Sequence, residues 1–405
     1  MSDVNRLLCL NHGINAATNT FGTVPASMTA QLQPRSSVPS LLPRQRTTIE
    51  RPLYVADGRR LPQILGARDV GPIELPLEFK GVNSNTGGAV SDWEAKMEQG
   101  NLLASIFGAV GVATSSAAPT ASGSAGGVLT ASSSVIQNLD IILFSTSSGG
   151  PYIRQVVSGG GSTSLVLDRE FAGTATGTIV RLARWSVDPD LIDHKAIWFN
   201  AEWANFRRRY NDCAPSQMVL GFPNAGLVTF DSTWLPNDWS DQAEANPAFA
   251  APAAGNPIVV SAAVFKMIET SYLLRNATLT ISNGLAVRET MAGANGVQGA
   301  VCADKTNVML EGEIFIGAND GTIGEMVDDS ITPTLDSFLG SDATAGDAIT
   351  VRDISLQVGT LAGGCMYVRI PEADIRGVVV EGGAFPVFKF QAMATGSAPL
   401  HLGVG

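Results

Sequence analysis

The side chains that most often carry acid–base, nucleophilic or metal chemistry are sparse in this chain. The three histidines are His12, His194 and His401. Their wide separation does not suggest a histidine-based triad or metal site. The four cysteines are Cys9, Cys213, Cys302 and Cys365. They have no C-x-x-C spacing, which predicts free thiols rather than a zinc site or a disulfide framework. We therefore predict no catalytic residues, no bound metal, no cofactor and no enzyme activity.

Three short motifs resemble ligand-binding loops, and each has a simpler structural interpretation. Gly159–Ser162 lacks the spacing and the lysine of a phosphate-binding loop, so it predicts a hairpin turn. Asn319–Gly321, which is followed by Glu325, resembles a calcium loop only in composition and predicts an ordinary acidic turn. The basic and aromatic stretch Arg207–Tyr210 could stack on nucleic acid, but we favour a subunit contact or a solvated turn.

The overall charge argues against one large class of partner. Lys and Arg number 26 against 37 Asp and Glu, which gives a net charge of -11. That is the wrong sign for holding nucleic acid by its phosphates, although an acidic surface can still act on DNA by repelling it. No apolar run approaches the roughly 18 residues of a membrane-spanning helix. No apolar block follows a basic start, so we expect neither a membrane span nor a classical signal peptide.

Carboxylates recur on single faces of two predicted strands. In residues 73–79, apolar residues alternate strictly with polar ones, and Pro76 indicates an edge or a bend. Residues 308–316 form a second predicted strand with two carboxylates at alternate positions. The same-face carboxylates are Glu74 and Glu78 in the first strand and Glu311 and Glu313 in the second.

The elements that must position these side chains are predicted to be mainly β. Hydrophobic residues make up 45% of the chain and charged residues only 16%, while 43 Gly and 21 Pro supply turns. The clearest strand lies within 276–289, where Thr278, Thr280 and Ser282 alternate with apolar residues and leave one face dry. Further strands are predicted at 258–268, 277–281, 308–316, 349–358, 367–370, 378–380 and 385–393.

One longer helix is predicted beside the sheet. Ser91–Glu94 has the spacing of a capping box, and apolar residues recur at helical intervals from Trp93 to Phe107. Gly108 then stands where a C-terminal glycine belongs. A short second helix is expected at 333–339, between the later strands.

A change in composition indicates an inserted module. Residues 109–133 are a low-complexity Ala/Ser/Gly/Thr tract that we interpret as a linker. Short apolar runs separated by glycine-rich turns follow and predict a small β barrel or sandwich. These runs are 139–144, 153–157, 165–167 and 179–182. We assign 61–111 and 185–405 to a main domain and 112–184 to an inserted small β domain, which a short loop should be able to replace.

Residues 1–60 differ from the rest of the chain. They are rich in Pro, Ser and Arg, contain no lysine and are weakly periodic. This composition predicts an extended arm that becomes ordered on a partner, with a plain disordered tail as the alternative. The arginines of the arm are Arg6, Arg35, Arg44, Arg46, Arg51, Arg59 and Arg60.

Several of these segments resemble the tail tube proteins of long-tailed bacteriophages. The strand TLTISNGL (278–285), followed by NVMLEGEIFIG (307–317), is similar to the paired central strands of that family. SLVLDREF and GTIVRLA, within 153–183, resemble the small insertion that many members carry. VEGGAFPVFKFQAMA (380–394) resembles the family's final strand, and the likeness covers residues 61–395 in order.

The resemblance implies a structural virion protein. Its expected architecture is a β-sandwich or barrel with one flanking helix, assembled into hexameric rings. The rings would stack into a hollow tube through which genome DNA is ejected without specific binding. The resemblance also implies a place in the virion tail, assembly in the host cytoplasm and no membrane contact. Expected partners are further copies of the chain, the tape measure protein, and tail terminator and baseplate proteins.

The same resemblance gives the candidate residues their roles. Residues 1–60 and 81–90 become candidates for segments that reach from one ring to the next. Within the arm, the candidates for stacking are Arg35, Arg44, Arg46 and Arg51. The candidates for the lining of the channel are Glu74, Glu78, Glu311 and Glu313, with the solvated outside of the sandwich as the alternative position.

Two other classes of protein stay open at this point. A major capsid protein is also Gly-rich, acidic and self-assembling with an N-terminal arm, but the sequence lacks the long central helix of capsid shells. A secreted β-rich hydrolase belongs to a different class, and the scarcity of histidine argues against it.

Overall fold

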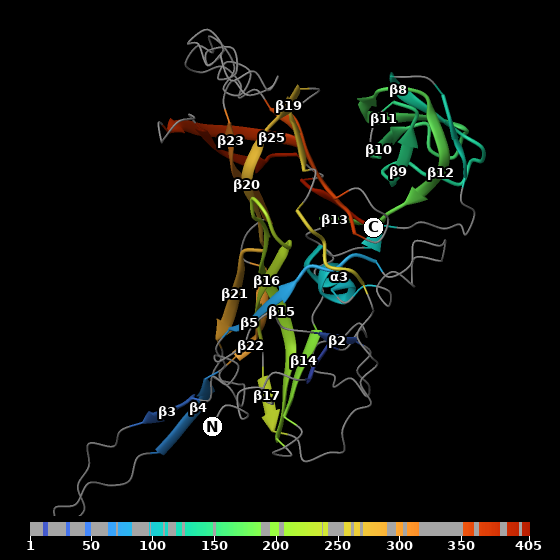
Figure 1. Ribbon diagram of the computed structural model, residues 1–405. Coiled ribbons are helices and arrows are strands. Elements are labelled where there is room, and N and C mark those ends of the chain that lie inside the picture. Colours follow the sequence, from blue (N-terminus) through green and yellow to red (C-terminus); the bar gives the residue numbers. More distant parts are fainter. Residues whose placement is uncertain are drawn as a thin grey trace, which may run out of the picture.

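The protein is mainly β, as the sequence predicts, and most of its strands form two bodies, a large main body and a small barrel (Figure 1). No helix in the described part of the chain is long and apolar enough to cross a membrane. The structure, a computed structural model, describes residues 11–14, 30–32, 45–49, 64–69, 72–82, 97, 99–107, 110–111, 119–123, 126–148, 151–187, 195–201, 206–236, 238–241, 255–260, 263–267, 270–289, 297–302, 306–315, 351–359, 364–380, 387–396 and 399–405.

The largest element of the fold is an antiparallel sheet that we call the front sheet. One face of each strand is buried and the other is not, because apolar and polar residues alternate along it. In β20, Ala277, Leu279 and Ile281 are buried while the residues between them are partly exposed, which confirms the predicted two-faced strand. In order across the sheet the strands are β5 (Ile73–Glu78), β16 (Thr229–Leu235), β15 (Phe206–Phe222), β20 (Leu274–Ser282), β23 (Asn307–Phe315), β26 (Val387–Ala394) and β25 (Met366–Val380).

Strand β5 lies at one edge of the front sheet, where its proline is tolerated. Among the described residues β5 pairs only with β16, and Pro76 lies opposite Asp231. The buried Gln99 side chain occupies the outer side of the strand's end. Its amide donates to the carbonyl of Glu78 (2.7 Å) and accepts from the N–H of Lys80 (3.3 Å), so it takes the place of a neighbouring strand.

A second layer covers the apolar face of the front sheet. Strand β25 continues from one layer into the other. Its first part, Met366 to Ile370, pairs with β24 and β27, and its last part pairs with β26, with a register shift near Pro371. Phe265 of the second layer stacks on Phe390 of β26 with ring centroids 5.1 Å apart. The strands of this layer are β24 (Arg352–Val358), β18 (Val264–Met267), β19 (Thr270–Tyr272), β27 (His401–Val404), β13 (Ala183–Ser186) and β6 (Val110–Gly111).

The predicted flanking helix is shorter than expected. Helix α3 (Gly100–Phe107) buries Leu102, Leu103, Ile106 and Phe107 in the same core as the front sheet and lies against β15 and β13. Met97 is buried but precedes the helix, so the predicted helical turn at this residue is wrong. The predicted cap and the C-terminal glycine lie outside the described residues: Ser91, Asp92, Trp93, Glu94 and Gly108.

The inserted residues form a small barrel with its own core, at the upper right of Figure 1. A six-stranded sheet closes on itself, since Thr120 bridges to Thr178 and the N–H of Ile179 donates to the carbonyl of Pro119 (2.7 Å). In sheet order the strands are β12 (Ala175–Arg181), β9 (Ile141–Thr146), β10 (Tyr152–Ser158), β11 (Ser164–Phe171), β8 (Gly126–Ala131) and β7 (Ala121–Ser122).

The interpretation of residues 109–133 as a linker is wrong for most of the tract that the structure describes. This tract supplies β6, β7 and β8, and Leu129 and Ala131 are buried in the barrel core. In β8, buried residues alternate with exposed ones. This is the pattern of a barrel strand, although the sequence of the tract has low complexity. The glycine-rich segment at Gly159–Ser162 is a hairpin turn, as predicted, with Gly159 and Gly161 at positive φ.

Further strands extend the lower half of the molecule. The first part of β15 continues into a sheet through β14, β17, β1 and β2, so residues within 1–60 take part in the body of the fold. The hairpins β3–β4 and β21–β22 are separate two-stranded sheets, and β3–β4 projects from the lower left of Figure 1. The bounds are β1 (Asn11–Ile14), β2 (Ala30–Leu32), β3 (Gln45–Ile49), β4 (Ile64–Asp69), β14 (Lys195–Ala201), β17 (Asp238–Asp241), β21 (Leu285–Glu289) and β22 (Val297–Cys302).

Two further sequence predictions have a clear outcome here, and two others cannot be compared with the structure. The predicted strands 367–370 and 378–380 are one strand, β25, because the chain bends near Pro371 without leaving the sheet. Arg207–Tyr210 lies inside β15, so a solvated turn at this place is wrong. The predicted helix at 333–339 and the acidic turn at 319–321 lie outside the described residues.

Candidate functional site

The structure brings the carboxylates of β5 and β23 onto one surface. Glu78 and Glu311 lie in the same cross-strand row, which passes through Thr229, Gly221 and Thr278. Glu74 lies four residues from Glu78, and Glu313 lies two residues from Glu311, so both are on the same side of the sheet as these partners. We call this side of the front sheet the polar face.

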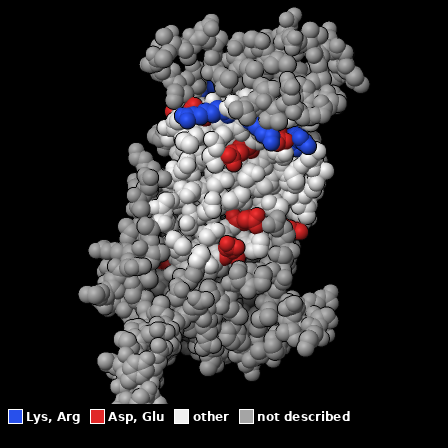
Figure 2. Space-filling view, turned by 90° about the vertical axis from the view of Figure 1, so that its left-hand side faces the viewer, with Lys and Arg blue, Asp and Glu red and all other residues white. Residues whose placement is uncertain are grey.

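The polar face carries little charge between its carboxylates. Strand β20 contributes Thr278, Thr280 and Ser282 to it, and β16 contributes Thr229 and Thr233. Figure 2 shows this side of the molecule: most of the described surface is uncharged, acidic side chains are scattered across the middle, and basic ones gather along the upper edge.

Sequence reasoning missed one acidic residue of the polar face. Asp231 of β16 lies opposite Pro76, between the glutamates of β5 and the rest of the sheet. The signal was available, because β16 alternates buried and partly exposed residues in the same manner as β5. The two-residue period that identifies the carboxylates of β5 and β23 also applies to this strand.

Glu313 differs from the other candidates because cations already surround it. Its carboxylate lies 3.1 Å from Lys389 Nζ and 3.3 Å from Arg275 Nη1. The amide of Asn276 also donates to it (3.3 Å). The hydrogen bond from Lys389, with the nearby charges of Lys389 and Arg275, holds the pKa of Glu313 below its ordinary value. This carboxylate therefore adds little net negative charge to the polar face.

The basic end of the polar face is built from residues on three strands. Arg275, Lys389 and Arg376 all have side chains that are half exposed or more. Arg376 pairs with Asp374 on its own strand (2.8 Å) and lies in the same cross-strand row as Glu311. The polar face thus changes from acidic in its middle to mixed charge at one end.

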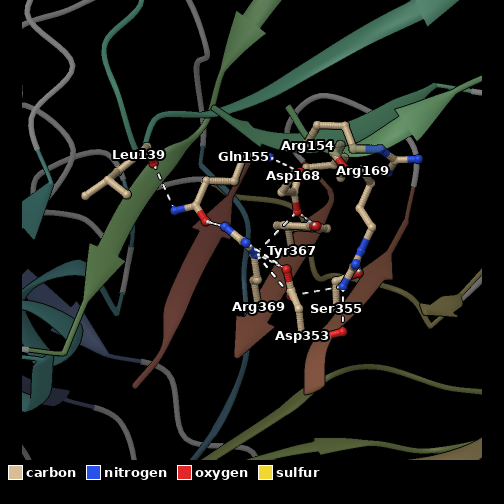
Figure 3. A network of polar contacts seen from close by, with 10 residues as sticks. Leu139, Arg154, Gln155, Asp168, Arg169, Asp353, Ser355, Tyr367 and Arg369 are labelled. Carbon is tan, nitrogen blue, oxygen red and sulfur yellow. Dashed lines mark hydrogen bonds and ion pairs between the residues drawn. The ribbon is translucent and has the colours of Figure 1, made fainter. Parts of the chain in front are cut away.

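A second notable arrangement lies where the barrel meets the second layer (Figure 3). Arg369 of β25 is the central side chain there. It forms an ion pair with Asp353 (2.7 Å), donates to Gln155 Oε1 of the barrel (2.5 Å) and lies 3.6 Å from the buried carboxylate of Asp168. Tyr367 also donates its hydroxyl to Asp168. Burial raises the pKa of both the Asp168 carboxyl and the Tyr367 hydroxyl.

A second arginine of this interface belongs to the barrel. Arg169 of β11 is almost fully buried, pairs with Asp353 (3.0 Å) and donates to Ser355 Oγ (3.3 Å). Gln357 Oε1 accepts from the N–H of Ile153, which ties β10 to β24 (3.2 Å). We call the polar groups that join the two bodies the clamp, and they are Gln155, Asp168, Arg169, Asp353, Ser355, Gln357, Tyr367 and Arg369.

Apolar contacts continue the interface beside the clamp. Ile141, Leu143 and Ile153 of the barrel share a buried cluster with Cys365 and Tyr367 of the body. The backbone of β27 approaches the same place so closely that a side chain on Gly403 would come within 2.7 Å of Ile141. The barrel is therefore packed against the main body rather than tethered to it.

Three of the side chains that could carry classical chemistry, those of His401, Cys213 and Cys365, are buried. His401 accepts or donates one hydrogen bond with Ser186 Oγ (2.8 Å), and burial together with nearby arginines lowers its pKa to about 4. Cys213 and Cys365 are buried and form no disulfide, and burial raises the pKa of Cys365 to about 12. No cluster of His, Cys, Asp or Glu within the described residues is arranged to hold a metal ion.

One of the four arginine candidates of the arm lies in a described strand. Arg46 lies in β3, opposite Arg68 of β4. The other three candidates, Arg35, Arg44 and Arg51, lie outside the described residues, as do Cys9 and His194.

Comparison with known proteins gives no further constraint. No protein-family model and no curated protein matches this chain.

Proposed function

We propose that this chain is the major subunit of a bacteriophage tail tube, in which hexameric rings stack and the polar face of the front sheet lines the channel. The observation that carries the proposal is the polar face itself. It extends across neighbouring antiparallel strands, and its reverse side is buried against α3 and the second layer. A sheet with one dry and one wet face is what a barrel with a water-filled bore requires.

The charge of the polar face suits the passage of DNA. A channel wall that carried many Lys or Arg side chains would neutralise phosphates and hold the strand. The middle of the polar face carries Glu74, Glu78, Asp231 and Glu311 among uncharged residues. Glu313, which its cationic neighbours neutralise, contributes least to this repulsion.

The partners follow from the same proposal. Further copies of the chain form the ring and the stack, the tape measure protein occupies the channel during assembly, and terminator and baseplate proteins close the two ends. The protein would then act in the virion tail, after assembly in the host cytoplasm, without enzyme activity and without a cofactor. Genome DNA passes through without specific binding.

The arm is the proposed link between rings. The β3–β4 hairpin, which contains Arg46, forms its own two-stranded sheet and projects from the body (Figure 1). A projecting basic segment can reach an acidic neighbour, and salt would weaken that contact. Arg35, Arg44, Arg46 and Arg51 are the side chains assigned to this role.

Negative-stain microscopy of the purified full chain tests the proposal, alone and with the tail proteins that would nucleate a tube. We expect rings of uniform diameter and striated hollow tubes. Closed shells would instead favour a capsid protein. A monodisperse monomer at high concentration, even with the nucleating proteins present, would overturn the proposal.

A further inference from the structure

One cross-strand row of the polar face is apolar in its middle. Val219 of β15 lies opposite Thr280 of β20, and Thr280 lies opposite Met309 of β23. Met309 in turn lies opposite Met393 of β26. Residues that lie directly opposite each other in neighbouring strands share one face of the sheet. Met393 is 39% exposed, and Val219 and Met309 are partly exposed. We call Val219, Thr280, Met309 and Met393 the apolar band.

The border of the apolar band is mainly acidic. Asp231 of β16 continues the row at one end, and Asp374 of β25 continues it at the other, where Arg376 pairs with it (2.8 Å). The next row contains Glu78 and Glu311, which have no ion-pair partner within the described part of the chain. Figure 2 shows these surroundings as uncharged side chains with acidic ones scattered among them. An exposed apolar patch with a charged rim marks an interaction site.

The backbone beneath the apolar band is already fully paired, and this limits what can bind there. Each of its strands, β15, β20, β23 and β26, has a hydrogen-bonded neighbour on both sides. An extended partner strand would therefore find no free sheet edge with which to pair. A helix satisfies its own backbone groups. The four strands, about 4.8 Å apart, make the band about 14 Å long. This is the length of roughly nine residues of helix.

The side chains of the apolar band and its border define the chemistry of that helix. Methionine is flexible and polarisable, so Met309 and Met393 can pack against apolar side chains of different shapes. The carboxylate of Glu311 favours a Lys or Arg beside such a contact and repels phosphate, which disfavours nucleic acid as the occupant. A second copy of the chain, with its net charge of -11, is also repelled.

We propose that the apolar band binds an amphipathic helix of a partner protein, with apolar residues of the helix against Met309 and Met393 and a Lys or Arg beside Glu311. The single chain carries this whole surface. That the helix belongs to the protein which fills the channel during assembly rests on the proposed tube function. The polar face would then hold a basic helical protein while the tube is built and repel the DNA that later replaces it.

Peptide binding to the full-length chain tests the proposal. The probe is a fluorescent synthetic peptide of about 18 residues, with leucine along one helical face and lysine along the other. Fluorescence anisotropy should show that the double variant Met309→Thr and Met393→Thr binds this peptide at least about tenfold more weakly than the wild type. Threonine suits a strand, so the unfolding temperature should stay close to that of the wild type. Met393→Thr alone replaces the double variant if that variant does not fold.

Charge is tested by a second variant and a second peptide. Glu311→Gln should weaken binding less than the double variant does and should lower its dependence on salt. A peptide with glutamate in place of lysine should not bind. Two matched controls lie on the barrel, where Val166→Thr removes an exposed apolar side chain and Glu170→Gln removes an exposed carboxylate. Both should bind the lysine peptide like the wild type.

Several results would overturn the role of the apolar band. They are equal binding by the wild type and the double variant, or tighter binding of a DNA duplex than of the lysine peptide. A double variant that loses self-association would make the band a contact between copies instead. A wild type that forms tubes but does not bind the peptide would refute the band and leave the tube function standing. A wild type that binds the peptide through the band but forms no rings would refute the tube function and leave the band standing.

Discussion

At the scale of single residues, Arg369 links two parts of the chain that are far apart in sequence. It lies between the buried Asp168 of the barrel and Asp353 of the body. Arg369→Ala removes the cation and leaves both carboxylates without it, so we expect the free energy of unfolding to fall by about 3–5 kcal/mol. Denaturant titration measures this change. Arg376→Ala, on the exposed part of the same strand, should cost less than about 1 kcal/mol, and equal losses would contradict the role of the clamp.

His401 makes stability depend on pH. Its pKa is about 4 in the folded protein against an ordinary value of 6.5, because burial and nearby arginines disfavour the charged ring. The unfolded chain therefore binds the proton first, and stability is lost as pH falls from 6.5 toward 4, by up to about 3 kcal/mol. His401→Gln should flatten this part of the pH profile in urea titrations. An unchanged slope would assign the pH dependence to other groups.

At the scale of elements, the local sequence pattern predicted those features of the fold that depend only on neighbouring residues. The two faces of β20, the edge position of Pro76 and the turn at Gly159–Ser162 all follow from neighbouring residues. The clamp could not be predicted, because Arg169 and Asp353 are 184 residues apart and the sequence around each residue does not identify the other. The strands within 109–133 were missed because small residues fit a curved barrel as well as a linker.

The docking of the barrel changes the expected result of removing it. From sequence, residues 112–184 should be replaceable by a short Gly/Ser loop without effect on assembly. The structure buries Cys365 and Tyr367 under the barrel and pairs Arg369 with Gln155. We now expect the shortened chain to unfold at a lower temperature and to aggregate, as measured by calorimetry and light scattering. Normal stability and normal tubes would mean that the interface contributes little.

The arm can be tested without disturbing the strands that lie within it. Deleting residues 2–50 would also remove β1, which pairs with β14, so substitution is the cleaner change. Replacing Arg35, Arg44, Arg46 and Arg51 by Gln should leave rings intact but shorten the tubes, and added salt should shorten wild-type tubes in the same way. Tube length in micrographs is the measurement. If the tubes of the variant are as long as those of the wild type, these arginines do not make the contact between rings.

At the scale of the whole molecule, the polar face sets what the proposed channel does to DNA. Within the described part of the chain, Glu74, Glu78 and Glu311 have no ion-pair partner, whereas Glu313 lies next to Lys389 and Arg275. A lysine at position 313 would crowd three cations and disturb the fold, so the test leaves that residue unchanged.

The triple variant Glu74→Lys, Glu78→Lys and Glu311→Lys reverses the charge in the middle of the polar face. We expect tubes of normal shape that retain added DNA at low salt and release it as salt rises, because each new cation neutralises a phosphate. Particles with such tails should eject their genome slowly. The matched triple Gln variant removes the negative charge without adding a positive one and should retain little DNA. If tubes of the triple lysine variant do not retain DNA, these residues lie on the outside of the assembly.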